Sequence, residues 1–393
     1  MTATTTAVPD QGSTPASPTS VGAVVRDYVG RVRGGEVGSL PALLGLVVLV
    51  LVFTSLRGAT FTNAFNLANL IHQSAAVIVI AMGLVFVLLL GEIDLSAGYT
   101  GGTAAAVMGI VVTRHELPWY LGVLVCLVTG AVVGTAIGLL VARVGTPSFV
   151  VTLALFLGLQ GVLLKLIGEG GTIAVRDEVL VGINNDDLPV WLGWLVALAI
   201  VAGYAFVATR RAAARRRSGL RADPQVVVVA KIVGLAVLVL GATAYLSTER
   251  SRNPNVTSIK GVPIVVVLVV ALLVLLNVLL TRTSFGRHVY AVGGNTEAAR
   301  RAGISVQRVK VICFAASSTL AAVGGILLAS RDNSVSPTTG GADTLLFAVG
   351  AAVIGGTSLF GGKGRMLDAV LGGLVIGIII NGMGLLNQPS SVV

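Results

Sequence analysis

The chain has 393 residues, of which 55% are hydrophobic and only 11% are charged. Soluble domains carry about 25% charged residues, so this composition excludes an ordinary soluble protein. Many apolar runs reach or approach the ~20 residues that a helix needs to cross a bilayer, and they do not alternate as barrel strands do. The net charge of +10 lies in the loops, where it orients a membrane protein, and does not indicate a nucleic-acid partner. The sequence predicts an all-α polytopic membrane protein.

The first 38 residues are rich in Thr, Ser, Pro and Gly and predict a disordered tail. They lack the layout of a cleaved signal peptide. Arg26, Arg31 and Arg33 precede the first apolar run and favour a cytoplasmic N-terminus. Residues 39–393 form the predicted transmembrane domain.

The apolar runs predict ten to eleven membrane-spanning elements. Two of these runs, 99–112 and 345–360, are short or broken by glycine and predict half-helices or re-entrant segments. The predicted elements are 40–56, 74–90, 99–112, 119–141, 144–167, 190–208, 226–246, 262–280, 309–329, 345–360 and 366–386.

Alternating sides along this path gives a consistent topology. The Arg-rich loop 209–225 and the basic loop 282–310 fall in the cytoplasm, and the acidic loop 169–190 falls outside. The loop 247–261 is the weakest point, because three basic residues fall outside. They are Arg250, Arg252 and Lys260.

A polar island, GGNTEAARRAG, lies between two apolar runs at Gly293–Gly303. Asn295 suits the N-cap of a short helix, Glu297 and two arginines suit the helix dipole, and Gly303 suits a left-handed end. So short a helix must be held by something, and a partner protein or a well-capped cytoplasmic loop are the two interpretations. The candidate contact residues are Gly293, Gly294, Asn295, Glu297, Ala298, Ala299, Arg300, Arg301 and Gly303.

The segment GEIDLSAG, residues 91–98, brings Glu92 and Asp94 to the membrane, where a carboxylate is costly unless it is paired or hydrated. Asp94 or Ser96 can cap the helix that follows. The alternatives are that these side chains line a hydrated pathway or form a cytoplasmic contact.

Two further stretches are candidates for a pathway. Pro147 is ordinary at a helix entrance, while Phe149 and Thr152 could face a channel. Glycines break any continuous helix over residues 353–373, and broken membrane helices persist where protein or water satisfies the backbone. The candidates in that stretch are Gly355, Thr357 and Ser358.

Catalytic patterns are missing from the sequence. Cys126 and Cys313 lie in apolar runs as small core residues, and the three histidines are scattered, so no metal site is predicted. No phosphate-binding loop of the G-x-x-x-x-G-K-[ST] type exists. An ion-coupled secondary transporter would need intramembrane ionisable groups. Its only candidates are Glu92, Asp94, Lys165 and Asp368.

Four motifs in order carry a family resemblance over roughly residues 60–387. They are GEIDLSAG, TPSFVVTLA, GRHVYAVGGNTEAARRAGISVQRVK and VIGGTSLFGGKG. In these motifs the chain resembles the permease subunits of bacterial ABC sugar importers, in the ribose, arabinose and xylose branch. The E-I-D-L-S form and the Arg-rich insertion are most similar to the xylose permeases.

The resemblance implies a type II importer fold in the bacterial inner membrane, as a permease homodimer docked on a cytoplasmic ATPase. It implies that residues 293–303 form the coupling helix, and that a binding protein outside delivers the sugar. ATP and Mg would be bound by the ATPase, and this chain would bind no cofactor and be no enzyme. Xylose is the first substrate expected, with other monosaccharides or polar solutes open. Relatives usually carry one more span and a basic tail, so the end at Gln388–Val393 suggests truncation.

Overall fold

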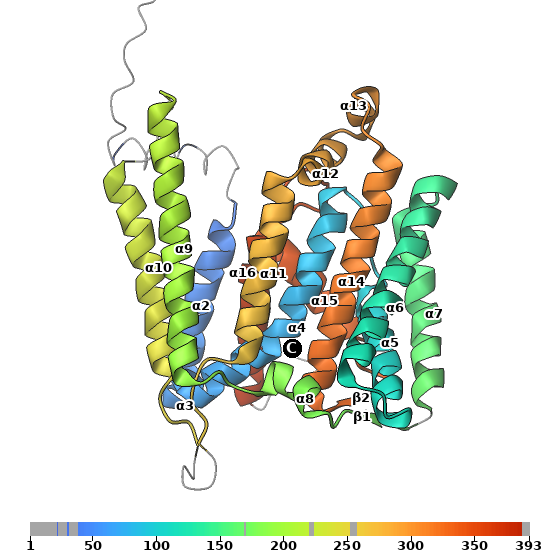
Figure 1. Cartoon of the computed structure of the whole chain (residues 1–393), viewed down its shortest axis with the longest axis horizontal. Coiled ribbons are helices and arrows are strands. Elements are labelled where there is room, and N and C mark those ends of the chain that lie inside the picture. The colour runs from blue at the N-terminus through green and yellow to red at the C-terminus, as the bar shows by residue number, and fades with distance from the viewer. Residues whose placement is uncertain are drawn as a thin grey trace, which may run out of the picture. The chain divides into compact units, whose positions relative to one another are not determined.

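The computed structural model of the chain is built of helices, with one two-stranded sheet among the described residues (Figure 1). The structure describes Gly22, Gly30 and residues 38–168, 170–219, 224–251 and 258–386. Apart from three glycines, the predicted tail over 1–38 lies outside the described residues, as do Arg252 and the chain end at Gln388–Val393. The chain divides into two units: the smaller includes Trp194–Thr243, and the larger comprises Gly38–Gly193 and Ala244–Val393.

Two long helices supply most of the smaller unit: α9 (Val190–Arg217) and α10 (Gln225–Leu246). The long helices of the larger unit are α2 (Leu40–Arg57), α4 (Ala64–Leu89), α6 (Trp119–Leu139), α7 (Ser148–Ile167), α11 (Ile264–Arg282), α14 (Val306–Asp332) and α16 (Met366–Leu385). Its shorter elements are α3 (Ala59–Thr62), α5 (Ala97–Gly109), α8 (Glu178–Asn185), α12 (Ser284–Gly294), α13 (Thr296–Arg301), α15 (Ala342–Gly355), the π-helical segments η1 (Ile110–Arg114) and η2 (Leu140–Val144), and the strands β1 (Ile173–Ala174) and β2 (Ser334–Val335).

Nine helices of the described chain are long and apolar enough to cross a membrane. With the shorter α5 and α15 they give eleven elements in the predicted order, which confirms the prediction of an all-α polytopic membrane protein. The two short helices fall where the sequence predicts short elements. Both are shorter than the ~20 residues of a full span.

Two helix boundaries differ from the prediction. Helix α4 begins at Ala64, ten residues before the predicted span, because Asn63 caps it by accepting a bond from the Asn66 amide at 2.7 Å. Helix α9 continues through Arg217, past the predicted end at residue 208. Alanine and arginine are strong helix formers, and cations suit a helix C-terminus, so the basic run prolongs the helix before the chain turns.

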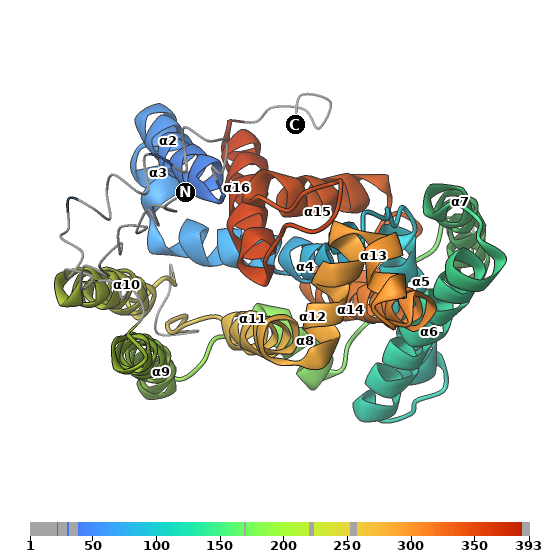
Figure 2. The same ribbon diagram turned by 90° about the horizontal axis from the view of Figure 1, so that it is seen from above.

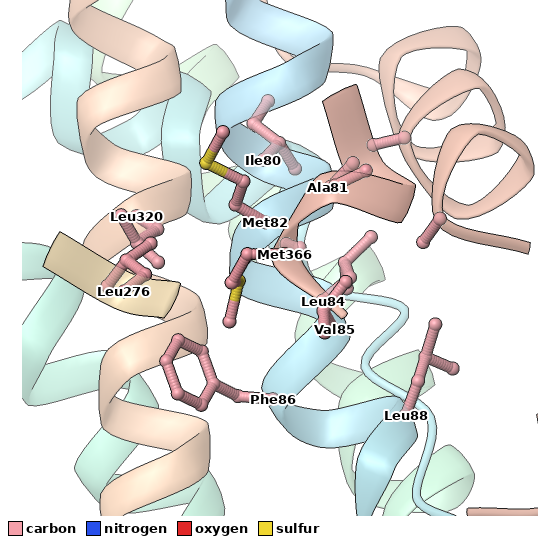
Figure 3. Close-up of a cluster of buried hydrophobic side chains, with 14 of the residues drawn as sticks. Ile80, Ala81, Met82, Leu84, Val85, Phe86, Leu88, Leu276, Leu320 and Met366 are labelled. Atoms are coloured by element: carbon pink, nitrogen blue, oxygen red, sulfur yellow. The ribbon is translucent and has the colours of Figure 1, made fainter. Parts of the chain in front are cut away.

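The core of the larger unit is centred on α4 and α14. Residues 74–90, which are most of α4 and the residue that follows it, are buried without a break, so protein encloses this part of the helix on every side. Figure 3 shows side chains of α4, among them Met82 and Phe86, lying against Leu276, Leu320 and Met366 from three other helices. Lipid is as apolar as leucine, so close packing rather than hydrophobic transfer holds such helices together.

Three glycines at four-residue spacing let α6 approach α14 backbone to backbone. A Cβ on Gly134 would lie 2.4 Å from the Phe314 carbonyl oxygen, which is closer than real Cβ atoms come. Gly130 and Gly138 meet the backbone of α14 in the same way. This arrangement is the small-residue packing that the glycine-rich composition predicts.

The short helices α5 and α15 begin beside each other in the interior. A Cβ on Gly98, in the first turn of α5, would lie 2.3 Å from the Gly340 carbonyl oxygen and 3.2 Å from the Leu345 Cβ. The far end of α5 lies at the sheet, where Gly109 contacts Ile173 of β1. Each short helix therefore follows a non-helical segment that enters the interior: residues 91–96 before α5 and residues 336–341 before α15.

The larger unit has two ends of different construction (Figure 1). At one end, α12 and α13 lie over the region where α4 and α14 meet, as the view from above shows (Figure 2). At the other end lie α8 and the pair of strands β1 and β2, which join antiparallel with Ile173 opposite Val335. We call these the α13 end and the α8 end.

Candidate functional site

Helix α13 has the local structure that its sequence predicts. The Asn295 side chain accepts a bond from the Ala298 amide at 2.9 Å and so caps the first turn. Glu297 lies in that turn, and two arginines lie in the last turn. Gly303 follows in a left-handed conformation, with φ of +82°, where side chains are disfavoured. The helix therefore has capping groups at both ends although it has only six residues.

The outer face of α13 is charged and exposed. Glu297 pairs with Arg300 at 3.1 Å and with Arg301 at 3.2 Å. All three side chains are more than half exposed, so each pair contributes little to stability. The two arginines carry one more charge than the single carboxylate neutralises. The face therefore has a net positive charge that is available to a partner.

The inner face of α13 is anchored in the protein core. Ala299 is 4% exposed and packs with Val292 of α12 and Val306 of α14. The Ile304 amide donates to the Ala299 carbonyl at 3.1 Å and turns the chain into α14. The helix that the sequence leaves without a support is thus held by its own chain, with its charged face outward.

Close backbone contacts join the start of the α13 region to two other segments. Gly293 lies against the end of α4, where a Cβ would be 1.7 Å from the Leu89 carbonyl oxygen. That oxygen accepts a bond from the Gly362 amide at 2.9 Å. Tyr290 donates to the Gly364 carbonyl at 2.7 Å, and burial raises the pKa of its phenol further above its usual range. We call the contacts of Leu89, Gly293 and Gly362 the glycine junction.

The segment after α4 is held by its two carboxylates. Glu92 forms an ion pair with Lys310 of α14, and both side chains are largely buried. Asp94 is 1% exposed and accepts bonds from the Ser96 amide at 3.0 Å, the Ser96 hydroxyl at 2.7 Å and the Ser317 hydroxyl at 3.2 Å. Of the two capping residues that the sequence offers, Asp94 is the one whose side chain bonds at the start of α5.

The start of α7 is tied to the same segment. The Ser148 hydroxyl accepts a bond from the Ile93 amide at 3.2 Å, and Thr152 donates to the Ile93 carbonyl at 3.3 Å. Thr152 is fully buried, whereas Phe149, one turn earlier in the helix, is 54% exposed. The structure therefore ties Thr152 to the segment that contains Asp94 and Ser96, and it leaves Phe149 exposed.

The turn between α15 and α16 contains the remaining pathway candidates. Gly355 ends α15 and lies against the Asp368 backbone, and Thr357 is buried with no hydrogen-bond partner for its hydroxyl. Ser358 accepts a bond from the Phe360 amide at 3.1 Å. Asp368 is 2% exposed and forms an ion pair with the Arg365 guanidinium at 3.1 Å. It also accepts a hydrogen bond from the Arg365 backbone amide at 2.8 Å. The turn that contains these groups also contains Gly362 of the glycine junction.

Sequence reasoning missed an ion pair at the α8 end. Arg250 is almost wholly buried, pairs with Asp187 and donates to the Leu246 and Gly261 carbonyls at 3.0 Å. Lys260 lies 3.7 Å from Glu249. Two basic residues that weaken the predicted topology are thereby neutralised by acids of the same end.

The chemistry of these clusters is binding and packing. In the part of the chain that the structure describes, no three His, Cys, Asp or Glu side chains lie together as metal ligands would. The carboxylates at Asp94 and Asp368 act as helix caps, and the one at Glu92 is paired. The nine long apolar helices of the described chain define a protein of the membrane, and α13 gives its larger unit an exposed, cationic surface.

Comparison with known proteins gives the family. Residues 66–392 match the family described as "Branched-chain amino acid transport system / permease component", and the chain belongs to it. It is 34% identical to the xylose transport system permease protein XylH of Escherichia coli (strain K12), over 88% of this chain and 86% of that one. It is 33% identical to XylH of Haemophilus influenzae, over 88% and 90%, and 29% identical to the E. coli ribose import permease protein RbsC, over 89% and 87%. No solved structure matches the chain.

These comparisons confirm the family resemblance that the four sequence motifs indicate. The chain is a permease subunit of an ABC transporter and works with a separate ATPase subunit and a binding protein.

Proposed function

We propose that this chain translocates a sugar, xylose or another monosaccharide, across the bacterial cytoplasmic membrane as half of a permease homodimer. The support for the substrate is the similarity to xylose and ribose permeases over nearly nine tenths of the chain. In this proposal the permease domain is 39–393, with the N-terminus, the basic segment 209–225 and the coupling loop 282–310 in the cytoplasm. In the same proposal the tail over 1–38 lies on the cytoplasmic side.

The observation that carries the proposed mechanism is the construction of α13. Its charged face is exposed, its inner face is anchored by Ala299, and the glycine junction joins its base to the end of α4. In the proposal, the ATPase subunit binds the face made by Glu297, Ala298, Arg300 and Arg301. Closure of the two ATPase subunits on ATP moves α13.

The junction suggests how that movement reaches the membrane interior. Leu89 ends α4 and leads directly into Glu92 and Asp94, and Gly362 leads into α16. Backbone groups in such close contact cannot slide past one another freely, so we propose that they move as one body. The segment 91–96 and the turn 355–358 are then the parts whose displacement opens the path on one side and closes it on the other. The proposed pathway residues are Glu92, Asp94, Ser96, Phe149, Thr152, Gly355, Thr357 and Ser358.

An ion-coupled secondary transporter is less well supported. Such a protein needs an ionisable group that can take up and release its coupling ion inside the membrane. Glu92 is held by Lys310, and Asp368 by Arg365. Asp94 accepts hydrogen bonds that fix the start of α5. These three carboxylates therefore have structural partners.

The test is co-purification of the chain with its ATPase subunit from mild detergent. Arg300→Glu with Arg301→Glu reverses the charge of the α13 face, and we expect loss of the complex. The matched control, Arg215→Glu with Arg217→Glu, makes the same charge change in α9 and should leave the complex intact. An undiminished complex with the α13 variant would show that α13 is not the docking element.

The substrate is tested with the wild-type complex in proteoliposomes. ATP-dependent uptake of labelled xylose, in the presence of the binding protein, is the expected result. Uptake of ribose and not xylose would keep the sugar class and replace the substrate.

A further inference from the structure

Phe360 is more exposed than any other large apolar side chain in the described part of the chain. It is 95% exposed, whereas Leu51 on the apolar helix α2 is 64% exposed and Leu346 on α15 is 66% exposed. Residues on membrane helices keep part of their surface against neighbouring turns. An aromatic side chain that is almost entirely free of its own protein is available to a partner, and aromatic residues are enriched at protein interfaces.

The turn that carries Phe360 has a fixed structure. The Ser358 amide donates to the Lys363 carbonyl at 2.8 Å and closes the turn. The Phe360 amide donates to the Ser358 hydroxyl at 3.1 Å, and the Gly361 amide to the Ser358 carbonyl at 3.5 Å. Phe360 thus stands at the tip of a hydrogen-bonded loop, so presenting its ring to a partner would cost little ordering of the chain.

This turn is continuous with the base of α13. The Gly362 amide donates to the Leu89 carbonyl oxygen, and the Gly293 backbone packs against that same oxygen. Tyr290 of α12 donates a hydrogen bond to the Gly364 carbonyl. A Cβ on Gly361 would lie 2.9 Å from the Gly293 carbonyl oxygen. The turn and the α13 region are therefore built against each other at the α13 end.

We propose that the turn Ser358–Arg365, with Phe360 at its tip, is a second contact for the ATPase subunit beside α13. This inference rests on the proposed function, because it assigns the ATPase as the occupant of both surfaces. Charged groups such as those of α13 give orientation and specificity, while aromatic side chains that enter a pocket supply much of the affinity at interfaces. The exposed Lys363 next to Phe360 continues the basic character of the α13 face.

The first experiment measures association of the purified full-length chain with its ATPase subunit. Phe360→Ala should weaken it by about tenfold, the loss expected when an aromatic anchor is removed. The matched control is Phe65→Ala, which removes a 59% exposed ring from the first turn of α4, toward the opposite end of that helix. It should bind as the wild type does.

The second experiment distinguishes protein from lipid as the occupant. Cys126 and Cys313 are fully buried, so a charged maleimide should react only with the thiol introduced by Phe360→Cys. We expect reaction in inside-out vesicles that lack the ATPase subunit, and protection when it is bound. A thiol that is unreactive in both states would place the side chain in lipid and overturn the inference.

The two proposals fail in different ways. If reversal of the α13 charges abolishes the complex while Phe360→Ala binds as the wild type does, this inference is wrong and the proposed function stands. If the α13 variant binds normally, the proposed docking helix is wrong, whatever the result at Phe360.

Discussion

Arg250 is a cation at the α8 end, which the proposed topology places outside the cytoplasm, where the positive-inside rule disfavours basic residues. The structure accounts for it locally. Its guanidinium is buried against Asp187 and the carbonyls of Leu246 and Gly261, so it presents almost no charge to the surroundings. The basic residue therefore belongs to the packing between the start of α11 and the segment after α8, and it says little about orientation.

Removal of Arg250 should be costly because Asp187 would be left buried without its partner. We expect Arg250→Met to lower the free energy of unfolding by about 3 kcal/mol, and Asp187→Leu in the same chain to recover part of this loss. The measurement is a double-mutant cycle on thermal or denaturant unfolding in detergent. Lys260→Met, which removes a half-exposed cation from the same loop, is the control and should change little. Additive effects of the two substitutions would contradict the pairing.

Individual residues differ in how well the sequence predicts them. Asn295, Glu297 and Gly303 have their predicted roles because a helix cap depends on neighbours within a few positions. The partner of Glu92 could not be predicted, since Lys310 is 218 positions away and only the packing of α4 on α14 brings them together. Capping motifs are local, whereas ion pairs between helices are a property of the assembled fold.

At the scale of elements, the loop between α10 and α11 is organised by one carboxylate. Glu249 accepts the Ser258 hydroxyl at 2.6 Å and the amides of Ser251 and Ile259 at 3.0 and 2.9 Å. These bonds hold the pKa of Glu249 down to about 2, and Lys260 adds to the effect. The ionised side chain thus joins Ser251 to Ser258 and Ile259, which lie on either side of residues 252–257.

The lowered pKa predicts a pH dependence with a definite sign. The folded-state pKa lies below the ordinary value of 4.5, so the carboxylate stabilises the loop fully above pH 4.5. That stabilisation is lost as the pH falls towards 2. Hydrogen-exchange protection of the Ser251 and Ile259 amides should therefore decline over this range. Glu249→Gln should show weak protection throughout, and equal protection in variant and wild type would contradict the role of the carboxylate.

Element boundaries were predicted where apolar runs begin and end, and this criterion fails when polar residues suit a helix. Asn63 begins α4 well before the apolar run, and alanine and arginine prolong α9 beyond it. The short helices α5 and α15 were expected from their length and glycines. The sequence does not predict that both helices begin at the same place in the interior. This arrangement depends on the contact between Gly98 and Gly340, which no local pattern encodes.

At the scale of the whole molecule, the larger unit places its two kinds of surface at opposite ends. The α13 end has a short cationic helix, an exposed aromatic side chain and the glycine junction. The α8 end has the strands β1 and β2 and paired charges. Between them lie the buried carboxylates and hydroxyls around Asp94. A permease that takes substrate from one partner and energy from another requires this separation of surfaces.

The sidedness of these ends yields the last prediction, which concerns orientation in the membrane. Ala298→Cys places a thiol on the exposed face of α13, and Val179→Cys places one on α8 at a position that is 46% exposed. The native cysteines are buried and serve as a silent background. A membrane-impermeant maleimide should label the α13 variant only in inside-out vesicles and the α8 variant only in spheroplasts. The reverse pattern would place α13 out of reach of a cytoplasmic ATPase, and labelling of both from one side would contradict the eleven-element topology.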